Sequence, residues 1–112
     1  MSQSSAPPVE DLTIDAVRSG LAAGTIVLVD VREPDEFEGG HIPGSILVPL
    51  SRFSASDIPD AAGRRIVLSC RSGRRSLIAA AMAFDQGLPI DAHYVGGFLD
   101  WVAQGEPVET GL

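Results

Sequence analysis

The sequence predicts an α/β domain built on a central, mostly parallel β-sheet with helices on both faces. Two apolar runs rich in β-branched residues, at positions 26–29 and 66–69, have the unbroken hydrophobicity of strands that are buried on both faces of a sheet. Helical patterns alternate with these runs and with shorter strand-like segments. Because parallel strands need long crossover connections, which are usually helices, the alternation favours a parallel sheet.

The N-terminal region is expected to contain a tail, an extended segment and one surface helix. Residues 1–8 are polar and end in two prolines, a composition that favours a flexible tail. An extended segment is expected at 9–12. Thr13 is placed to cap a helix that ends at Gly24. Apolar residues recur along this helix at helical spacing, at Ile14, Val17 and Leu21.

The segment between the two buried strands is expected to be short and mixed. Pro34 suits the first turn of an acidic helix over 35–38, which two glycines then stop. A Pro-Gly turn at 43–44 precedes a short strand at 46–48. Residues 51–62 are polar, and we expect them to be irregular with one or two helical turns.

The remainder of the chain is expected to complete one domain. After the second buried strand, a polar loop leads into an apolar helix at 77–86. A last short strand is expected at 92–95, followed by a helix that two glycines open. We expect the domain to span residues 9–108, with residues 109–112 as a C-terminal tail.

The composition narrows the possible partners. A formal net charge of −7 opposes association with nucleic acid or an anionic membrane. No run approaches the roughly 20 apolar residues that span a bilayer, and the first residues do not resemble a signal peptide. The single cysteine cannot form an internal disulfide, so we expect a reducing, cytoplasmic setting.

Cys70 is the strongest candidate for a reactive group. It directly follows a buried strand and precedes a helix, and ligand sites of open α/β sheets lie at such strand ends. The helix N-terminus and Arg71, Arg74 and Arg75 favour a thiolate, because positive charge near a cysteine lowers the pKa of its thiol below the ordinary value of about 8.5. Gly73 allows the loop to turn N–H groups toward an anion. A lone cysteine is otherwise often an inert buried hydrophobe, an interpretation that the arginine cluster disfavours.

Short motifs distributed along the chain resemble, in order, those of the rhodanese family. The resemblance runs from about Val9 to Val108, and its most specific part is the Cys-x-x-Gly-x-Arg loop. Ser45 departs mildly from the alanine usual at that place. The motifs are Asp30-Val31-Arg32, Glu36-Phe37, Gly40-His41-Ile42-Pro43-Gly44, the loop from Cys70 to Arg75, and Gly96-Gly97 with Trp101.

The resemblance implies a single-domain, rhodanese-like sulfurtransferase that needs no cofactor and no metal. The Cys70 thiolate would take the outer sulfur of a donor such as thiosulfate or a persulfide, and would hold it as a cysteine persulfide. A thiol, cyanide or an acceptor protein would then collect the sulfur. The spacing does not show which arginine binds the donor. The expected anion cradle consists of Arg71, Ser72, Gly73, Arg74 and Arg75.

Two alternative functions are compatible with the same fold. Phosphatases and arsenate reductases related to this family carry an arginine at the sixth place after the cysteine, which gives a wider cup. Here Ser76 occupies the sixth place and Arg75 the fifth, so the loop favours sulfur transfer. The other alternative is a non-catalytic binding module, although such modules often lack the cysteine that this chain retains.

Other polar residues are expected to be structural. His41 lies in a Gly-His-Ile-Pro-Gly turn, where a hydrogen bond to the backbone is the favoured interpretation over a proton shuttle. Asp30 and Arg32 suit a structural ion pair at least as well as a contact with substrate. His93 has no cysteine or second histidine at zinc-ligand spacing, so no metal site is expected there.

Overall fold

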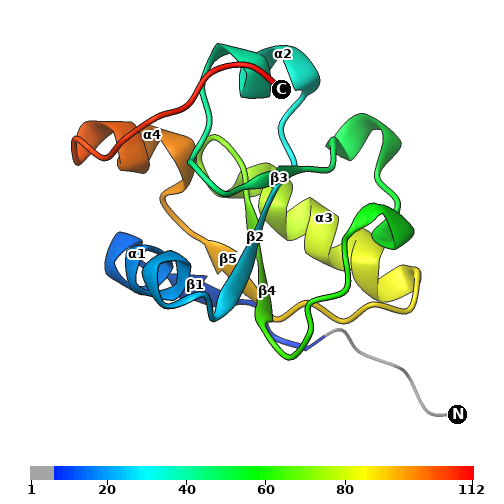
Figure 1. The fold of residues 1–112 in the computed structure, drawn as a ribbon. Coiled ribbons are helices and arrows are strands. Elements are labelled where there is room, and N and C mark those ends of the chain that lie inside the picture. The colour runs from blue at the N-terminus through cyan, green and yellow to red at the C-terminus, as the bar shows by residue number, and fades with distance from the viewer. Residues whose placement is uncertain (1–6) are drawn as a thin grey trace, which may run out of the picture.

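Five short strands form one parallel sheet in the computed structural model, which describes residues 7–112 (Figure 1). Their order across the sheet is β1-β5-β4-β2-β3, and every neighbouring pair runs parallel. Crossover connections are therefore needed, which confirms the predicted α/β class. The strands are β1 (Glu10–Leu12), β2 (Ile26–Asp30), β3 (Ile46–Leu47), β4 (Arg65–Ser69) and β5 (Ala92–Tyr94).

The two strands predicted to be buried, β2 and β4, lie next to each other in the interior of the sheet. Their register pairs Ile26 with Arg65 and Asp30 with Ser69, so both strands end at the same level. Cys70 follows Ser69 directly, which places it just beyond the carboxyl edge of the sheet.

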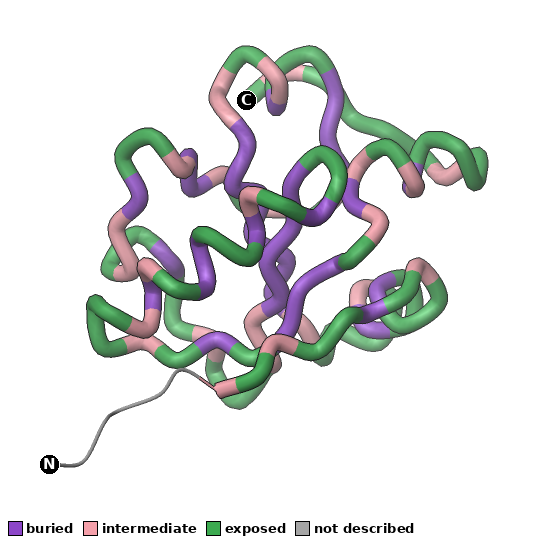
Figure 2. Tube along the Cα trace, turned by 180° about the vertical axis from the view of Figure 1, so that it is seen from behind, coloured by how far each residue is buried: buried purple, intermediate pink, exposed green. Residues whose placement is uncertain are grey.

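Helices cover both faces of this sheet (Figure 1). One hydrophobic cluster joins α1 and α4 to the sheet, and the other joins α3 to the opposite face. Helix α2 follows the carboxyl end of β2, and Figure 2 shows buried positions concentrated along the central strands. The bounds are α1 (Ile14–Ala23), α2 (Pro34–Gly39), α3 (Arg74–Asp85) and α4 (Gly97–Ala103).

Side chains of the strands alternate between these two clusters, as the pleat of a strand requires. On β4, Val67 packs in the cluster with α1 and α4, and Leu68 packs in the cluster with α3. On β5, Ala92 and Tyr94 belong to the cluster with α1 and α4. His93, between them, therefore faces α3.

The helix after Cys70 begins earlier than we expected. Helix α3 starts at Arg74, whereas the apolar pattern indicated a start at residue 77. Gly73 is its N-cap and lies in the left-handed region at φ +92°, and arginine and serine have enough helix propensity to continue the helix back to that turn. Arg74 and Arg75 thus lie in the first helical turn, and the loop is short.

The other elements lie close to their predicted positions. Helix α1 has Thr13 as its N-cap, although the Thr13 side chain makes no capping hydrogen bond, and it ends at Gly24 with φ +70°. Helix α2 begins with a capping box between Glu33 and Glu36. The segment expected to be irregular contains two 3₁₀ turns, Leu50–Arg52 and Ala55–Asp57.

The C-terminal residues contact the domain. Glu109 forms an isolated antiparallel bridge with His41, and the Gly111 N–H donates to the carbonyl of Glu38. Residues 1–6 of the expected N-terminal tail lie outside the described residues. Within residues 7–112, no helix has both the length and the apolar composition that crossing a membrane would need.

Candidate active site

Cys70 lies at the base of a short loop between β4 and α3. The residue is 1% exposed and packs within the hydrophobic cluster under α3. The loop continues through Arg71 and Ser72, both exposed, to Gly73 at the helix N-terminus. The sulfur is therefore enclosed, and a donor must present a small reactive atom to reach it.

Hydrogen-bonding groups surround the sulfur. The Gly73 N–H donates to Cys70 Sγ at 3.1 Å, and the Cys70 thiol donates to Ser76 Oγ at 3.7 Å. Burial raises the pKa of the Cys70 thiol and is the largest single effect. Hydrogen bonds from the backbone and hydroxyl of Ser76, and from Ser72 and Gly73, together outweigh it, so this pKa lies below its ordinary value. The site thus favours a nucleophilic thiolate.

Position 73 requires a glycine for two reasons, the backbone conformation and the lack of space for a side chain. Its φ of +92° is rarely adopted by residues with a side chain, and an added Cβ would lie 2.4 Å from the Val95 carbonyl oxygen. The same conformation points the Gly73 N–H at Cys70 Sγ. The sequence argument for a glycine at this place therefore holds, with a close approach to Val95 as a second reason.

The start of α4 holds the loop from the other side. The N–H groups of Phe98 and Leu99 donate to the carbonyls of Cys70 and Arg71, at 2.9 and 3.1 Å. Gly97 has φ +65°, and an added Cβ would lie 2.6 Å from the carbonyl oxygens of both loop residues. We had expected these glycines only to open a helix. The Gly-Gly pair was visible in the sequence, but the sequence did not show that Gly97 would pack against the Cys70 loop.

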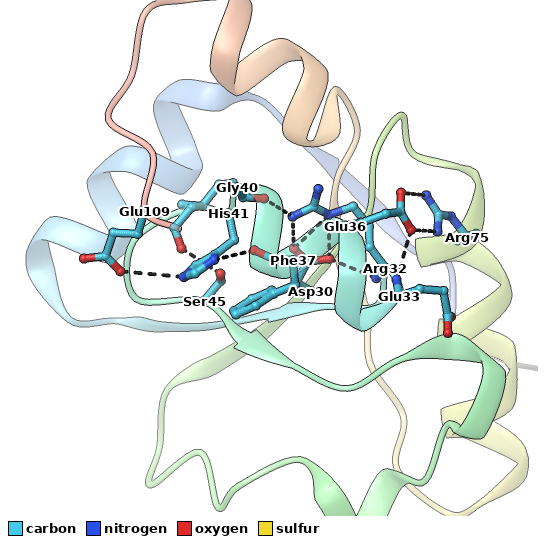
Figure 3. A network of polar contacts seen from close by, with 11 residues as sticks. Asp30, Arg32, Glu33, Glu36, Phe37, Gly40, His41, Ser45, Arg75 and Glu109 are labelled. Atoms are coloured by element: carbon cyan, nitrogen blue, oxygen red, sulfur yellow. Dashed lines mark hydrogen bonds and ion pairs between the residues drawn. The ribbon is translucent and has the colours of Figure 1, made fainter. Parts of the chain in front are cut away.

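The three arginines near Cys70 differ in their surroundings. Arg75 forms two hydrogen bonds with Glu36 of α2, at 2.6 and 2.9 Å (Figure 3). This contact lowers the pKa of Glu36 to about 2. Arg71 and Arg74 are exposed. The structure thus brings all three to the site region, with the guanidinium of Arg75 already held by a carboxylate.

Asp30 and Arg32 form a buried ion pair beside the site. Two guanidinium nitrogens of Arg32 lie 3.0 and 2.7 Å from Asp30 Oδ2, and Nη2 also donates to the Gly40 carbonyl at 2.8 Å (Figure 3). The Arg32 guanidinium lies 4.3 Å from the centre of the Phe98 ring. These contacts are those of a structural ion pair, which the sequence supported at least as well as a contact with substrate.

His41 is also engaged by the fold. Its Nδ1 lies 2.8 Å from the Phe37 carbonyl oxygen, and its ring stacks on Phe37 with centroids 3.7 Å apart (Figure 3). Its Nε2 lies 3.7 Å from a carboxylate oxygen of Glu109. The backbone hydrogen bond is the one we expected for this turn, so His41 connects α2 to the C-terminal segment.

His93 is a residue whose place in the site the sequence did not indicate. It is 1% exposed, and its two ring nitrogens lie 2.7 Å from Ser76 Oγ and 2.7 Å from Asp11 Oδ1. Ser76 had been noted only as the residue that replaces a sixth-place arginine. Among the described residues, no three or more His, Cys, Asp or Glu side chains are grouped as they would be around a metal ion.

Comparisons with known proteins agree with this geometry. The family model for the rhodanese-like domain matches residues 13–104. An uncharacterized protein of Synechocystis, slr1261, is 43% identical over 82 residues, which are 73% of this chain and 46% of that protein. A sulfurtransferase of Allochromatium vinosum is 36% identical over 85 residues, 74% of this chain and 78% of the relative.

Solved structures show the same similarity. The human single-domain sulfurtransferase TSTD1 superposes with a TM-score of 0.70 and 29% sequence identity, over 84% of this chain and 96% of the human chain. The chain thus spans almost the whole length of the human protein, but less than half the length of the Synechocystis protein.

Proposed function

This chain belongs to the rhodanese-like domain family, and we propose that it is a sulfurtransferase in which Cys70 carries sulfane sulfur as a persulfide. The observation that carries the proposal is the enclosed Cys70 sulfur, which faces backbone N–H groups at the start of α3 and whose pKa is lowered by them and by Ser76. A persulfide ends in a negatively charged sulfur, which the same donors can stabilise.

The first half-reaction is a displacement at sulfur. The Cys70 thiolate attacks the outer sulfur of a donor such as thiosulfate, and a new S–S bond forms as the bond from that sulfur to the sulfite group breaks. Sulfite leaves with the bonding electron pair, and Cys70 persulfide remains with one negative charge. Total charge is conserved, and no oxidant or cofactor takes part.

The second half-reaction returns the enzyme to its starting state. An acceptor thiolate or cyanide attacks the outer sulfur of the persulfide, and the Cys70 thiolate leaves. Because Cys70 is 1% exposed, the acceptor needs to present a small nucleophilic atom to the loop. A low-molecular-weight thiol or a cysteine on a flexible segment of an acceptor protein meets this requirement.

We assign different roles to the residues of the expected anion cradle. Ser72 and Gly73 supply N–H groups to the sulfur. Arg71 and Arg74, which are exposed, attract the anionic donor to the loop. Arg75 positions α2 against α3 through Glu36. The cytoplasmic setting expected from the sequence stays a prediction.

The phosphatase alternative is disfavoured by the sixth place of the loop. Ser76 is fully buried there and faces Cys70 and His93, so the loop offers no guanidinium at that place for a tetrahedral oxyanion. The binding-module alternative is disfavoured by the lowered pKa of Cys70, since a docking surface has no need of a reactive thiol.

Release of sulfite in a single turnover tests the proposal. With excess thiosulfate and no acceptor, the wild-type chain should release about one sulfite per Cys70, and continued turnover should start only when cyanide or a thiol is added. Cys70→Ser should release none. Turnover of phosphate esters without sulfite release would support the phosphatase alternative. The absence of both activities would support the binding module.

A further inference from the structure

A continuous hydrogen-bonded chain connects Cys70 to the surface of the protein. Cys70 Sγ contacts Ser76 Oγ at 3.7 Å, Ser76 Oγ lies 2.7 Å from His93 Nδ1, and His93 Nε2 lies 2.7 Å from Asp11 Oδ1. Ser76 and His93 are buried, whereas the Asp11 side chain is 64% exposed. The sulfur-transfer scheme above does not use His93 or Asp11.

The fold builds this chain from two strands, one helix and the loop that follows β4. The register of β1 and β5 pairs Asp11 with His93, which brings the carboxylate beside the imidazole. His93 faces α3 because its neighbours on β5 face the opposite side of the sheet. Ser76 lies in the first turn of α3, between His93 and Cys70, the residue that follows β4.

The hydrogen-bond partners fix the direction of each bond while the thiol is protonated. The Cys70 thiol donates to Ser76 Oγ. The single hydroxyl proton of Ser76 then has His93 Nδ1 as its acceptor, and the remaining ring proton on Nε2 is donated to the Asp11 carboxylate. Every proton in the chain therefore points away from the sulfur.

We propose that His93 receives the proton of Cys70 through Ser76, with Asp11 holding the imidazole in place. In the step, the S–H bond breaks and the Ser76 oxygen gains that proton as its own proton moves to His93 Nδ1. The result is a Cys70 thiolate that accepts a hydrogen bond from Ser76, and a His93 imidazolium that donates to both Ser76 and Asp11. Protons and charge balance within these four residues.

The arrangement removes the main cost of ionising a buried thiol. An isolated charge in the protein interior is strongly unfavourable, whereas the transfer creates a positive charge on His93 for the negative charge on Cys70. The charged groups that face the pair are Asp11 from β1, in contact with His93, and Arg75 from α3, which interacts electrostatically with Cys70. From β4 and the loop, Leu68 and Gly73 approach His93 without charge.

The inference rests on the proposed function only in that sulfur transfer uses the thiolate. His93 and Asp11 are positioning residues here, because they act on the sulfur through Ser76.

The test is the pH dependence of Cys70 alkylation by iodoacetamide, which needs no sulfur donor. His93→Gln should raise the pH midpoint of alkylation by about one unit, which is a tenfold loss of thiolate at a fixed pH below the midpoint. Asp11→Asn should raise it too, because the imidazolium loses its partner. A purely through-space effect would act in the opposite direction, since removing a negative charge favours the thiolate.

His41→Gln is the matched control, because His41 is also buried but contacts Phe37 and Glu109 instead of the Cys70 chain. Its midpoint should equal that of the wild type even if its stability falls. An unchanged midpoint in His93→Gln, or a lowered one in Asp11→Asn, would overturn the proposal. Sulfite release measured on the same variants shows separately whether the proposed function holds.

Nitrogen NMR of the two histidines gives an independent signature. In wild-type protein with Cys70 ionised, both ring nitrogens of His93 should carry protons. After alkylation of Cys70 the negative charge is gone, so Nδ1 of His93 should lose its proton while His41 stays unchanged. A His93 ring that is insensitive to alkylation would contradict the transfer.

Discussion

The groups that contact the Cys70 sulfur are not the arginines that lie near it in the sequence. The Gly73 N–H and the Ser76 hydroxyl reach the sulfur directly. Arg71 and Arg74 are exposed, and Arg75 is paired with Glu36. At the scale of the residue, the proposed function therefore assigns stabilisation of the thiolate to dipoles of the loop and helix, and attraction of the donor to the exposed arginines.

Comparing the alanine variants of Gly73 and Gly87 separates the cost of backbone strain from the cost of crowding at the Cys70 loop. Gly73→Ala should cost more unfolding free energy than Gly87→Ala, because both glycines have φ near +90° but an added Cβ at Gly87 meets nothing within 4 Å. We expect about 1–2 kcal/mol for Gly87→Ala from strain alone, and about 1–3 kcal/mol more for Gly73→Ala from the contact with Val95. Urea unfolding of both variants measures the difference, and equal losses would show that the loop has room for a side chain.

The exposed arginines should influence donor binding and leave the chemical step intact. Arg71→Ala and Arg74→Ala should each raise the KM for thiosulfate by roughly twofold to fivefold, the effect of about 0.5–1 kcal/mol expected of exposed charges. The kcat value should stay close to that of the wild type, and the difference in KM should shrink at high salt. Arg64→Ala, at the opposite end of β4, serves as the control. Equal effects of all three substitutions would mean that net charge alone attracts the donor.

At the scale of elements, the loop is held between two helices. Helix α4 binds its carbonyls through Phe98 and Leu99, and α2 reaches α3 through the pair of Glu36 and Arg75. The first contact joins the Cys70 loop to α4, and the second joins the helix after the loop to α2. Both fix where the loop stands relative to the sheet.

The Glu36–Arg75 pair should make stability depend on pH in one direction. Because the folded pKa of Glu36 is about 2, below its ordinary value of 4.5, the pair stabilises the fold above about pH 4.5 and loses this effect as the pH falls toward 2. Glu36→Gln should cost about 1 kcal/mol at pH 7, a modest value because both side chains are partly exposed. The gap from wild type, measured by urea unfolding, should close in acid. Glu38→Gln, on the same helix and exposed, should cost little at any pH. A gap that stays constant down to pH 2 would contradict the lowered pKa.

At the scale of the whole molecule, the helices and strands could be predicted from the sequence, but the contacts between elements distant in the chain could not. The runs at 26–29 and 66–69 predicted β2 and β4, and the fold class followed from their alternation with helices. Cys70 could be chosen as the candidate nucleophile because the strand end, the glycine and the helix start are local signals. The hydrogen bonds that connect Cys70 to Ser76, His93 and Asp11 could not be predicted in this way. Parallel pairing of β1 with β5 brings residues 11 and 93 together although they lie 82 positions apart in the sequence.

The same limit applies to the arginines and to the start of α3. The cluster of three arginines was visible, but the capture of Arg75 by Glu36 depends on how α2 packs, 39 positions earlier in the chain. The apolar pattern placed the helix start at 77 because Arg74 and Arg75 are polar, and polar residues in a first turn leave no periodic signal. The sequence was thus enough to select Cys70 as the candidate nucleophile, whereas the contacts that lower its pKa could be found only in the folded chain.

Intact-protein mass spectrometry tests the central claim most directly. After incubation with thiosulfate and removal of small molecules, the wild-type chain should gain the mass of one sulfur atom, and a thiol should remove it again. Cys70→Ser, which has a side chain of similar size that also forms hydrogen bonds, should gain nothing. A wild-type mass that stays unchanged with both thiosulfate and a cysteine-persulfide donor would contradict the assignment of Cys70 as a sulfur carrier.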